Sequence, residues 1–438
     1  MAIAGPAPLA QIPTARSTRI GLTVLSSVIG TAVEWYDFLI YGLATALVFN
    51  KLFFPLSNST ASTLAAFATL GVGYFARPLG AAIFGHFGDR IGRKSMLALT
   101  IILMGLGTFL VGLLPTYEQI GVAAPVLLVA LRLLQGLGLG GEWGGAVLMA
   151  VENAAPQNRG LMAALVQLGY PIGNLAAIGV FAALALLPGP DFLAWAWRIP
   201  FLLCIVLAGV GLWIRLNIEE TQAFEAMKSS RGVARLPIGE VLTEHRRPFF
   251  LAVGLKLSEI SYATIAGIFV INYVTVRLGL PRSLVLNAIL VSAAAALVAI
   301  PAFGWLSDRI GRKPMFYTGC VFEMAFAFPL FWLLDTKDPV LVTTGIAVAL
   351  VFGQYIGFSV GASWYPELFG TRTRYSGASL GFQVGAAISG GLTPFAAASF
   401  VAWTGGATWP ISVYLIALAA ISLAAAIAAP ETAGKPLR

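Results

Sequence analysis

Acidic and basic side chains lie inside long apolar runs of this chain, where an ionised group is costly unless it is paired or used for function. Glu34 and Asp37 are three residues apart and Tyr41 follows four residues later, so a helix would place all three on one face. Arg132 and Gln135 share a face of another run in the same way. A carboxylate beside an arginine stays ionised until the arginine moves away, so Glu34, Asp37 and Arg132 could form a proton-coupling switch. Alternatively, they form an ion-pair cluster that only assembles the helices.

Further polar side chains in the apolar runs are candidates for contact with a solute. Arg77 could bind an anion or anchor the end of its helix, which we expect about two turns away. Lys256 could bind an anion or extend to the membrane surface, whereas Glu259 lies deeper in the same run. Central glutamines could line a polar cavity or join helices by hydrogen bonds. The candidate substrate-binding residues are Arg77, Gln167, Tyr170, Lys256, Glu259, Gln383, Tyr41 and Gln135.

Two other acids lie within apolar runs. Glu142 is flanked by glycines, and both a structural hydrogen-bonding role and a transport role remain open for it. Glu323 is expected to face a neighbouring helix or a lumen, and the sequence assigns it no task.

A charged loop occurs twice. Residues 85–94 read GHFGDRIGRK, and residues 304–313 read GWLSDRIGRK, each copy between two long apolar runs. Asp89 could pair with Arg93 or Arg159, and Asp308 correspondingly with Arg312 or Arg374. Such clusters would close one side of the protein, whereas ordinary basic loops would need neither the aspartate nor the matched glycines. The candidate gating residues are Asp89, Arg90, Arg93, Glu152, Arg159, Asp308, Arg309, Arg312, Glu367 and Arg374.

Other motifs recur at nearly the same offset as the charged loop. Glu152 precedes Arg159 by seven residues, as Glu367 precedes Arg374. A Gln-x-Gly sequence begins at residue 167 and again at residue 383. Parallel repeats of about six spans each are typical of one large class of secondary transporters.

The composition predicts a polytopic membrane protein. The 438 residues are 58% hydrophobic and 11% charged, far below the charged quarter of a usual soluble domain. A membrane barrel would show short alternating segments, but these runs are continuous, so we predict an all-α protein with twelve transmembrane helices in two pseudo-symmetric six-helix bundles. The expected spans are 20–49, 60–84, 95–115, 124–150, 160–187, 197–216, 248–276, 284–306, 314–334, 339–363, 375–401 and 408–429. The expected domains are a tail at 1–19, bundles at 20–216 and 248–429, a linker at 217–247 and a tail at 430–438.

The formal net charge of +8 reflects topology rather than nucleic-acid binding. Most of the 27 Lys and Arg residues fall in loops on the side of the N-terminus, which the positive-inside rule makes cytoplasmic. Both termini are therefore expected in the cytoplasm, and the expected partners are the lipid bilayer, protons and a small solute, without nucleic acid.

Nothing in the sequence favours an enzyme. The two histidines, His86 and His245, lie in loops, and Cys204 and Cys320 sit singly in separate spans. The sequence shows no paired metal ligands, catalytic triad or phosphate-binding loop, so we expect no metal, no cofactor and no catalytic residue.

Several motifs together resemble a known family. The two charged loops and residues 132–140 (RLLQGLGLG) are similar to signatures of the major facilitator superfamily. Within it, the chain resembles the bacterial metabolite:proton symporters, through residues 34–38 (EWYDF), 75–80 (FARPLG), 141–145 (GEWGG), 197–201 (WRIPF) and 219–225 (EETQAFE). Residues 45–50 and 374–378, continuing to 393–395, look most like shikimate-type members.

The resemblance implies a proton-coupled importer of a small organic acid, such as shikimate or a di- or tricarboxylate, that works by alternating access in the bacterial inner membrane and functions as a monomer. Glu34, Asp37 and Arg132 match the proton-coupling region of that family. The alternatives are a symporter of a zwitterion, such as proline or betaine, and a proton-driven exporter of the same fold. Exporters commonly carry a Gly-Pro motif in the fifth span, where this chain has Pro171 within GYPIG.

Overall fold

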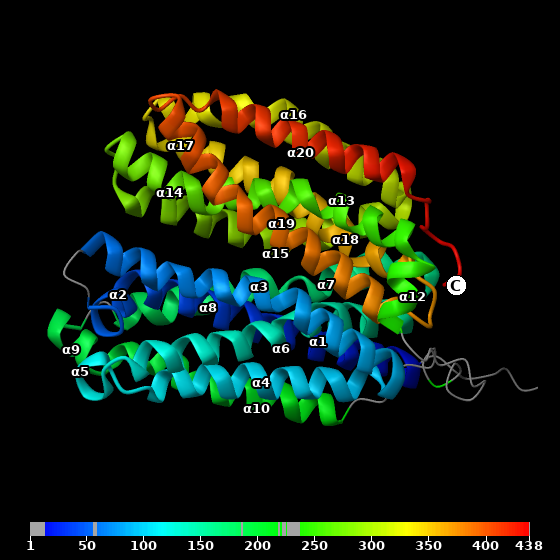
Figure 1. The fold of residues 1–438 in the computed structure, drawn as a ribbon. Helices are drawn as coiled ribbons and strands as arrows, with labels where there is room; N and C mark the ends of the chain where they lie inside the picture. The colour runs from blue at the N-terminus through cyan, green and yellow to red at the C-terminus, as the bar shows by residue number, and fades with distance from the viewer. Residues whose placement is uncertain are drawn as a thin grey trace, which may run out of the picture.

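The computed structural model describes residues 14–55, 59–184, 187–217, 220, 225 and 237–437, and every regular element in these ranges is helical. Figure 1 shows two stacked groups of long helices. The N-terminal bundle holds α1 (Thr14–Ala44), α3 (Ser59–Ile91), α4 (Arg93–Leu113), α6 (Ala123–Asn153), α7 (Arg159–Val166), α8 (Gly169–Leu184) and α10 (Ile199–Leu216). The C-terminal bundle holds α13 (Arg246–Thr264), α15 (Arg282–Ile310), α16 (Arg312–Asp335), α17 (Pro339–Val348), α18 (Tyr355–Glu367), α19 (Arg374–Trp403) and α20 (Trp409–Ala428).

Short elements extend and connect the long helices. π-Helical turns with short helices continue α1 and α13, as η1 (Thr45–Phe49), α2 (Asn50–Leu52), η4 (Ile265–Phe269), α14 (Val270–Asn272) and η5 (Tyr273–Arg277). A π-helical segment, η6 (Ala349–Gln354), joins α17 to α18. The connections contain α5 (Tyr117–Ile120), η2 (Pro156–Asn158), α9 (Gly189–Ala194), η3 (Ala196–Arg198) and α12 (Pro237–Thr243).

Eleven helical segments of the described chain are long and apolar enough to cross a membrane. The long helix α3 is not among them, because Arg77 and several small or polar residues reduce its apolar character. α3 also continues to Ile91, into the first charged loop. Arg77 thus lies about four turns from that end, not the two turns expected, and is placed well inside the bundle.

The fifth span is broken at its polar centre. α7 ends at Val166 and α8 begins at Gly169. Pro171 has no backbone N–H and its ring crowds the carbonyl four residues earlier, that of Gln167, so a continuous helix is disfavoured there. The break positions Gln167 between two half-helices in the interior, where its side chain is fully buried.

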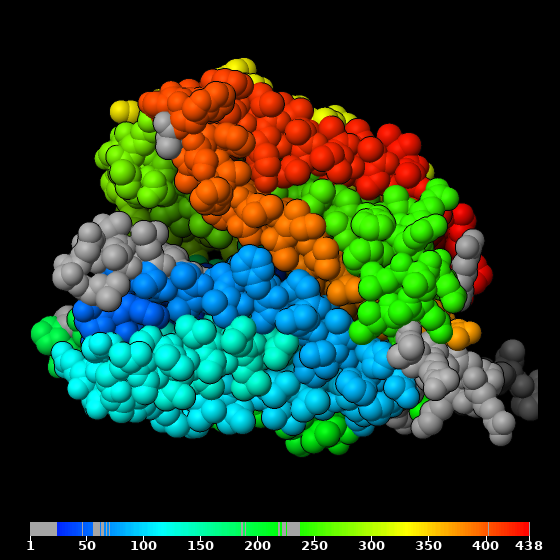
Figure 2. Space-filling view, in the orientation of Figure 1, coloured from blue at the N-terminus to red at the C-terminus, as the bar shows by residue number. Residues whose placement is uncertain are grey.

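The two bundles meet at the end of the molecule that carries loops 85–94 and 304–313, which we call the basic end. Figure 2 shows them in contact near the C-terminus, with a hollow between them toward the opposite end. A Cβ on Gly304 of α15 would lie 2.6 Å from the carbonyl oxygen of Gly160, and a Cβ on Gly85 of α3 would lie 2.7 Å from Cα of Ser376. The first glycine of each charged loop is therefore required by a close approach to a helix of the other bundle.

Gly304→Ala tests this approach. The added methyl group meets backbone atoms of α7 that cannot move independently. We therefore expect the free energy of unfolding to fall by about 1–3 kcal/mol, as for other overpacked sites. The measurement is the thermal midpoint of the purified protein in detergent. Gly209→Ala is the matched control, since Gly209 is an α10 glycine with open space around its Cβ position. Equal midpoints for the two variants would contradict the close contact.

Candidate functional site

A buried ion pair lies in the middle of the N-terminal bundle. Nη1 of Arg132 lies 3.8 Å from Oδ2 of Asp37, and both side chains are almost completely buried. Gln135 donates to Oδ1 of Asp37 at 2.9 Å, and the hydroxyl of Thr108 donates to the same oxygen. The Arg132 guanidinium lies 4.1 Å from the centroid of the Tyr41 ring. Three helices, α1, α4 and α6, thus hold one carboxylate in a polar cage with a single cation.

The structure does not place Glu34 in this pair. Among the described residues, no Lys or Arg nitrogen lies within 4.0 Å of Glu34, and its Oε2 has no hydrogen-bond partner although the side chain is 4% exposed. Successive residues of an α-helix are rotated by about 100°, so positions three apart point about 60° from each other. Asp37 reaches Arg132, whereas the charged groups that act on Glu34 include Arg77 and Arg215. The expectation that both acids face one arginine is therefore wrong.

Arg77 reaches the same region from α3. Its guanidinium lies 5.0 Å from the ring centroid of Phe38 and 4.6 Å from that of Tyr74. The Arg132 guanidinium lies on Phe38 as well, at 5.6 Å. Within the described ranges, no carboxylate lies within 4.0 Å of Arg77, although its side chain is buried. Arg77 therefore retains the capacity to pair with an anion.

The C-terminal bundle has its own buried pair. Nζ of Lys256 lies 2.5 Å from Oε2 of Glu259 on the same helix, α13, and both side chains are 1% exposed. The ammonium also lies 3.9 Å from the ring centroid of Phe382 on α19. The indole of Trp143 stacks on Phe382 with centroids 3.7 Å apart. A cation–aromatic stack thus joins Lys256 to α6 of the other bundle.

The two repeat-related glutamines cross between the bundles. Gln167 accepts a hydrogen bond from Nε1 of Trp143 and donates to the carbonyl of Phe358 on α18 at 3.3 Å. Gln383 on α19 donates to the carbonyl of Leu139 on α6 at 3.4 Å. These side chains join helices by hydrogen bonds and lie beside the aromatic stack of Trp143 and Phe382.

Tyr170 lies in an aromatic group at the same level. Its ring is perpendicular to that of Trp35, with centroids 4.7 Å apart, and lies 5.6 Å from that of Phe358. Its hydroxyl is within hydrogen-bonding reach of Gln354 and Asn174. The α1 and α8 helices of one bundle and the α18 helix of the other therefore meet around the ring of Tyr170.

Sequence reasoning missed the partner of Glu142. Arg215, near the end of α10, is 3% exposed and binds both carboxylate oxygens of Glu142, at 2.9 Å from Nη1 to Oε2. The hydroxyl of Thr100 donates to Glu142 Oε2 at 2.7 Å. Arg215 lies at the end of its apolar run, where the sequence does not distinguish it from a loop cation. The pair links α4, α6 and α10 away from the interface between the bundles, which favours the structural role for Glu142.

At the basic end, each loop aspartate faces a helix start in the opposite bundle. The Asp89 carboxylate accepts the backbone N–H groups of Tyr375 and Ser376 at the start of α19, at 3.2 and 2.9 Å. Asp308 accepts those of Gly160 and Leu161 at the start of α7, both at 2.8 Å. Helix N-termini present free N–H groups and a positive dipole end, so these are favourable positions for a carboxylate.

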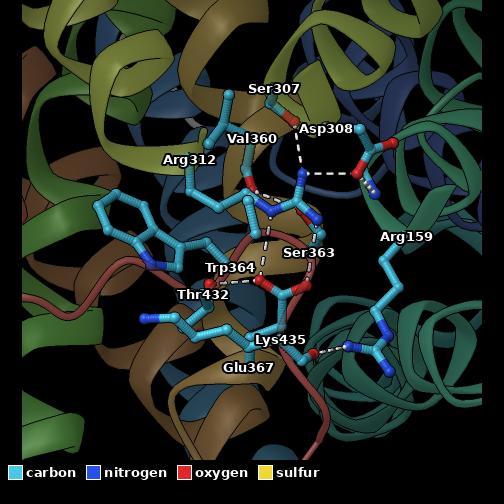
Figure 3. A network of polar contacts seen from close by, with 12 residues as sticks. Arg159, Ser307, Asp308, Arg312, Val360, Ser363, Trp364, Glu367, Thr432 and Lys435 are labelled. Atoms are coloured by element: carbon cyan, nitrogen blue, oxygen red, sulfur yellow. Dashed lines mark hydrogen bonds and ion pairs between the residues drawn. The ribbon is translucent and has the colours of Figure 1, made fainter. Parts of the chain in front are cut away.

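Ion pairs complete this arrangement. Asp89 pairs with Arg93 and Asp308 with Arg312, as one of the two expectations had it. The alternative partners bind elsewhere, Arg374 to Glu152 across the bundles at 2.9 Å and Arg159 to the carbonyl of Lys435 at 2.6 Å. Figure 3 shows the second loop, where Arg312 also reaches Glu367 at 3.1 Å. We call Asp89, Arg93, Glu152, Asp308, Arg312, Glu367 and Arg374 the basic-end cluster.

Two candidate gating residues lie outside this cluster. Arg90 and Arg309 are exposed. Nη1 of Arg90 lies 3.4 Å from Nε2 of His86, and the Arg309 guanidinium lies 4.9 Å from the ring centroid of Trp305. Each arginine contacts a neighbour within its own helix.

The segment after α20 folds back onto the second loop. Glu431 accepts the backbone N–H groups of Arg312 and Lys313, which begin α16, and those of Thr432 and Ala433. Burial opposes ionisation of the Glu431 carboxyl, but these N–H donors outweigh it and hold its pKa below the ordinary value of 4.5. The hydroxyl of Thr432 donates to Glu367, which ties this segment to the basic-end cluster (Figure 3).

Comparison with known proteins identifies the fold. The family model described as Major Facilitator Superfamily matches residues 27–394. The chain belongs to the major facilitator superfamily. It is 42% identical to the "Shikimate transporter" of Escherichia coli (strain K12) over 414 residues, which cover 94% of each chain. It is 32% identical to the "Proline/betaine transporter" of Salmonella typhimurium, covering 99% of this chain and 88% of the relative.

Solved structures agree with this assignment. The proton:xylose symporter XylE covers 96% of this chain and 98% of its own, with a TM-score of 0.77 at 16% identity, which shows the fold alone. The predicted fold class and the family resemblance are confirmed, and the relatives are transporters rather than enzymes. The major facilitator protein described here is therefore a multi-pass membrane transporter.

The basic-end cluster generates one prediction. Asp308→Asn removes the charge that two N–H groups of α7 and Arg312 share, so the bundles should separate more readily at this end. We expect maleimide to label a single cysteine that replaces Ala164 about 10-fold faster. This factor corresponds to ~1.4 kcal/mol, the contribution of one charge-assisted hydrogen bond. Cys204 and Cys320 are replaced beforehand. Arg309→Gln is the control, and equal labelling of both variants would leave the loops with a topological role only.

The Glu142–Arg215 pair generates a second prediction. Removing one partner leaves a buried uncompensated charge, so Glu142→Gln should lower the free energy of unfolding by about 3–5 kcal/mol. Glu142→Gln combined with Arg215→Met removes both charges and should recover most of that loss. The thermal midpoints of the single and double variants measure this. Normal stability but lost transport in Glu142→Gln would instead indicate a transport role.

Proposed function

We propose that this protein is a proton-coupled secondary active importer of a small organic acid, such as shikimate or a di- or tricarboxylate. The observation that carries the proposal is the buried Asp37–Arg132 pair with Arg77 beside it, unpaired among the described residues. A carboxylate that releases its arginine can take up a proton, and a free buried arginine can receive a substrate anion. The 42% identity to a shikimate transporter over 94% of the chain supports the class of substrate.

We assign the proton-coupling role to Asp37, Glu34 and Arg132. Asp37 is ionised while it pairs with Arg132 and takes up its proton when that pair opens. Glu34 has no cation within pairing distance in the described chain and holds its proton more readily, because a bare buried carboxylate is costly. Its place one turn from Asp37 makes it the next group along α1 for a proton.

Alternating access follows from the interface between the bundles. The substrate site lies between them, with Arg77, Tyr41 and Gln135 on one side, Lys256, Glu259 and Gln383 on the other, and Gln167 and Tyr170 at the broken fifth span. The basic-end cluster closes one side of this site, and its opening would release the substrate there. We propose that the basic end is cytoplasmic, that both termini lie there, and that the protein acts as a monomer in a bacterial inner membrane.

A zwitterion is the second candidate substrate. The relatives include proline/betaine transporters, and Lys256 with Glu259 offers a cation and an anion 2.5 Å apart. A solute with both charges could separate this pair and bind to its two members. An exporter of the same fold would use the same coupling residues in the opposite direction.

Uptake into proteoliposomes distinguishes these candidates. Labelled shikimate, citrate, α-ketoglutarate, proline and betaine are offered with and without an imposed pH gradient, acidic outside. We expect accumulation of an organic acid that a protonophore abolishes. Preference for betaine or proline would select the zwitterion, and uptake indifferent to both gradient and protonophore would exclude symport.

Asp37→Asn is the sharpest variant for this proposal. Asparagine imitates the protonated acid, so the step that needs ionised Asp37 on Arg132 is lost. We expect at least tenfold lower accumulation under a pH gradient, while exchange of internal for external substrate persists because it requires no net proton movement. Asp191→Asn, at an exposed acid of α9, is the matched control. Normal accumulation by Asp37→Asn would make Asp37 structural.

A further inference from the structure

The C-terminal bundle contains more buried acid than buried cation at its centre. Glu323, in the middle of α16, is 2% exposed, and its Oε2 has no hydrogen-bond partner. Ser258 of α13 is within hydrogen-bonding reach of this carboxyl group, and Glu259 lies within electrostatic range of it. Oε1 of Glu259 also has no partner, since Lys256 binds only Oε2. The centre of this bundle thus holds two carboxyl groups and one ammonium, which contacts only Glu259.

The neighbouring elements supply no second cation. In the ranges that the structure describes, no Lys or Arg nitrogen lies within 4.0 Å of Glu323. The adjacent segments α17, η6 and α20 contain no charged residue. Charged groups of α15, α18 and α19 sit at the helix ends, where Asp308 and Glu367 bind Arg312, and Arg374 binds Glu152.

Apart from Glu259, the titratable groups that face Glu323 are neutral. They are the thiol of Cys320 on its own helix and the hydroxyls of Tyr262 and Tyr365, on α13 and α18. Neither tyrosine oxygen has a hydrogen-bond partner in the described chain. A polar group of three helices is therefore buried with a net charge of −1 unless it binds a proton, and an uncompensated charge in such a position is strongly disfavoured.

We propose that Glu259 and Glu323 form a second proton-binding site, which already holds one proton at rest and takes up another when a substrate carboxylate occupies Lys256. This inference rests on the proposed function for the identity of the trigger. At rest, Glu323 carries the proton and Glu259 is ionised on Lys256. When the substrate carboxylate takes the ammonium, Glu259 accepts a proton, and it loses that proton again when the substrate leaves and the pair re-forms. One anion and one proton then cross the membrane together.

The site acts in series with Asp37. Glu259 and Glu323 link the proton to the bound anion, whereas Asp37 governs the step that needs an ionised carboxylate on Arg132. Loss of either therefore prevents accumulation, for different reasons. The Asp37→Asn variant should still take up a proton when substrate binds. Loss of the C-terminal site in that variant should remove this proton uptake.

Infrared spectroscopy tests the site without any substrate, through the carbonyl stretch of protonated carboxyl groups. Glu323→Gln should remove one such signal from the wild-type spectrum at neutral pH. Lys256→Met imitates the departure of the ammonium, so it should add a signal that Lys256→Met combined with Glu259→Gln lacks. Glu118→Gln, at an exposed acid of α5, is the control and should change neither. An unchanged spectrum in both Glu323→Gln and Lys256→Met would overturn the proposal.

Adding shikimate separates this inference from the proposed function. In Asp37→Asn, saturating shikimate should produce the same new signal as Lys256→Met, and Glu259→Gln in that background should abolish it. If Lys256→Met gains the signal but adding a substrate carboxylate does not produce it, the proton site stands and the assigned substrate class is wrong. If shikimate binds and Glu259 does not become protonated, the link between anion and proton is refuted.

Discussion

The contact on which this structure most depends is that of a carboxylate with the start of a helix in the other bundle. Asp89 and Asp308 each satisfy two backbone N–H groups that helix geometry leaves free. Each contact crosses the interface between the bundles, so it exists only while the basic end is closed. Glycines 85 and 304 allow the backbones to approach closely enough for these hydrogen bonds. The closed state of this end therefore depends on both the carboxylates and the close packing.

Inside the apolar bundles, the main constraint is the free-energy cost of burying a charged side chain. Asp37, Glu142 and Glu259 each have one cation as partner, in three separate pairs. The Glu142–Arg215 pair lies within one bundle and has hydrogen bonds for both carboxylate oxygens. The Asp37–Arg132 pair lies within the N-terminal bundle and the Lys256–Glu259 pair within the C-terminal bundle, and each leaves one carboxylate oxygen without a hydrogen bond, Asp37 Oδ2 and Glu259 Oε1. Fully satisfied pairs suit a structural role, whereas incompletely satisfied ones can exchange partners at lower cost.

The sequence predicted the large features because each left a pattern. Two charged loops at one spacing implied two related bundles, and long apolar runs implied membrane helices. The sequence could not predict contacts made by backbone atoms, because every residue type carries them. Charge pairing suggested Arg93 or Arg159 for Asp89 and Arg312 or Arg374 for Asp308, and the first of each is observed. The backbone N–H groups that both aspartates bind left no such pattern. Arg215 was not recognised as the partner of Glu142, because a buried arginine at a helix end has the sequence pattern of a loop cation.

The two bundles are related in sequence but differ in how their central charges balance, and this difference bears on how a proton and an anion can be moved together. The N-terminal bundle combines Glu34 and Asp37 with Arg132 and Arg77, so an arriving anion finds a cation that is already free among the described residues. The C-terminal bundle combines Glu259 and Glu323 with Lys256 alone. An anion there must displace a carboxylate, and a displaced buried carboxylate requires a proton. Under the proposed function, the N-terminal bundle would receive the anion and the C-terminal bundle would make its binding depend on a proton.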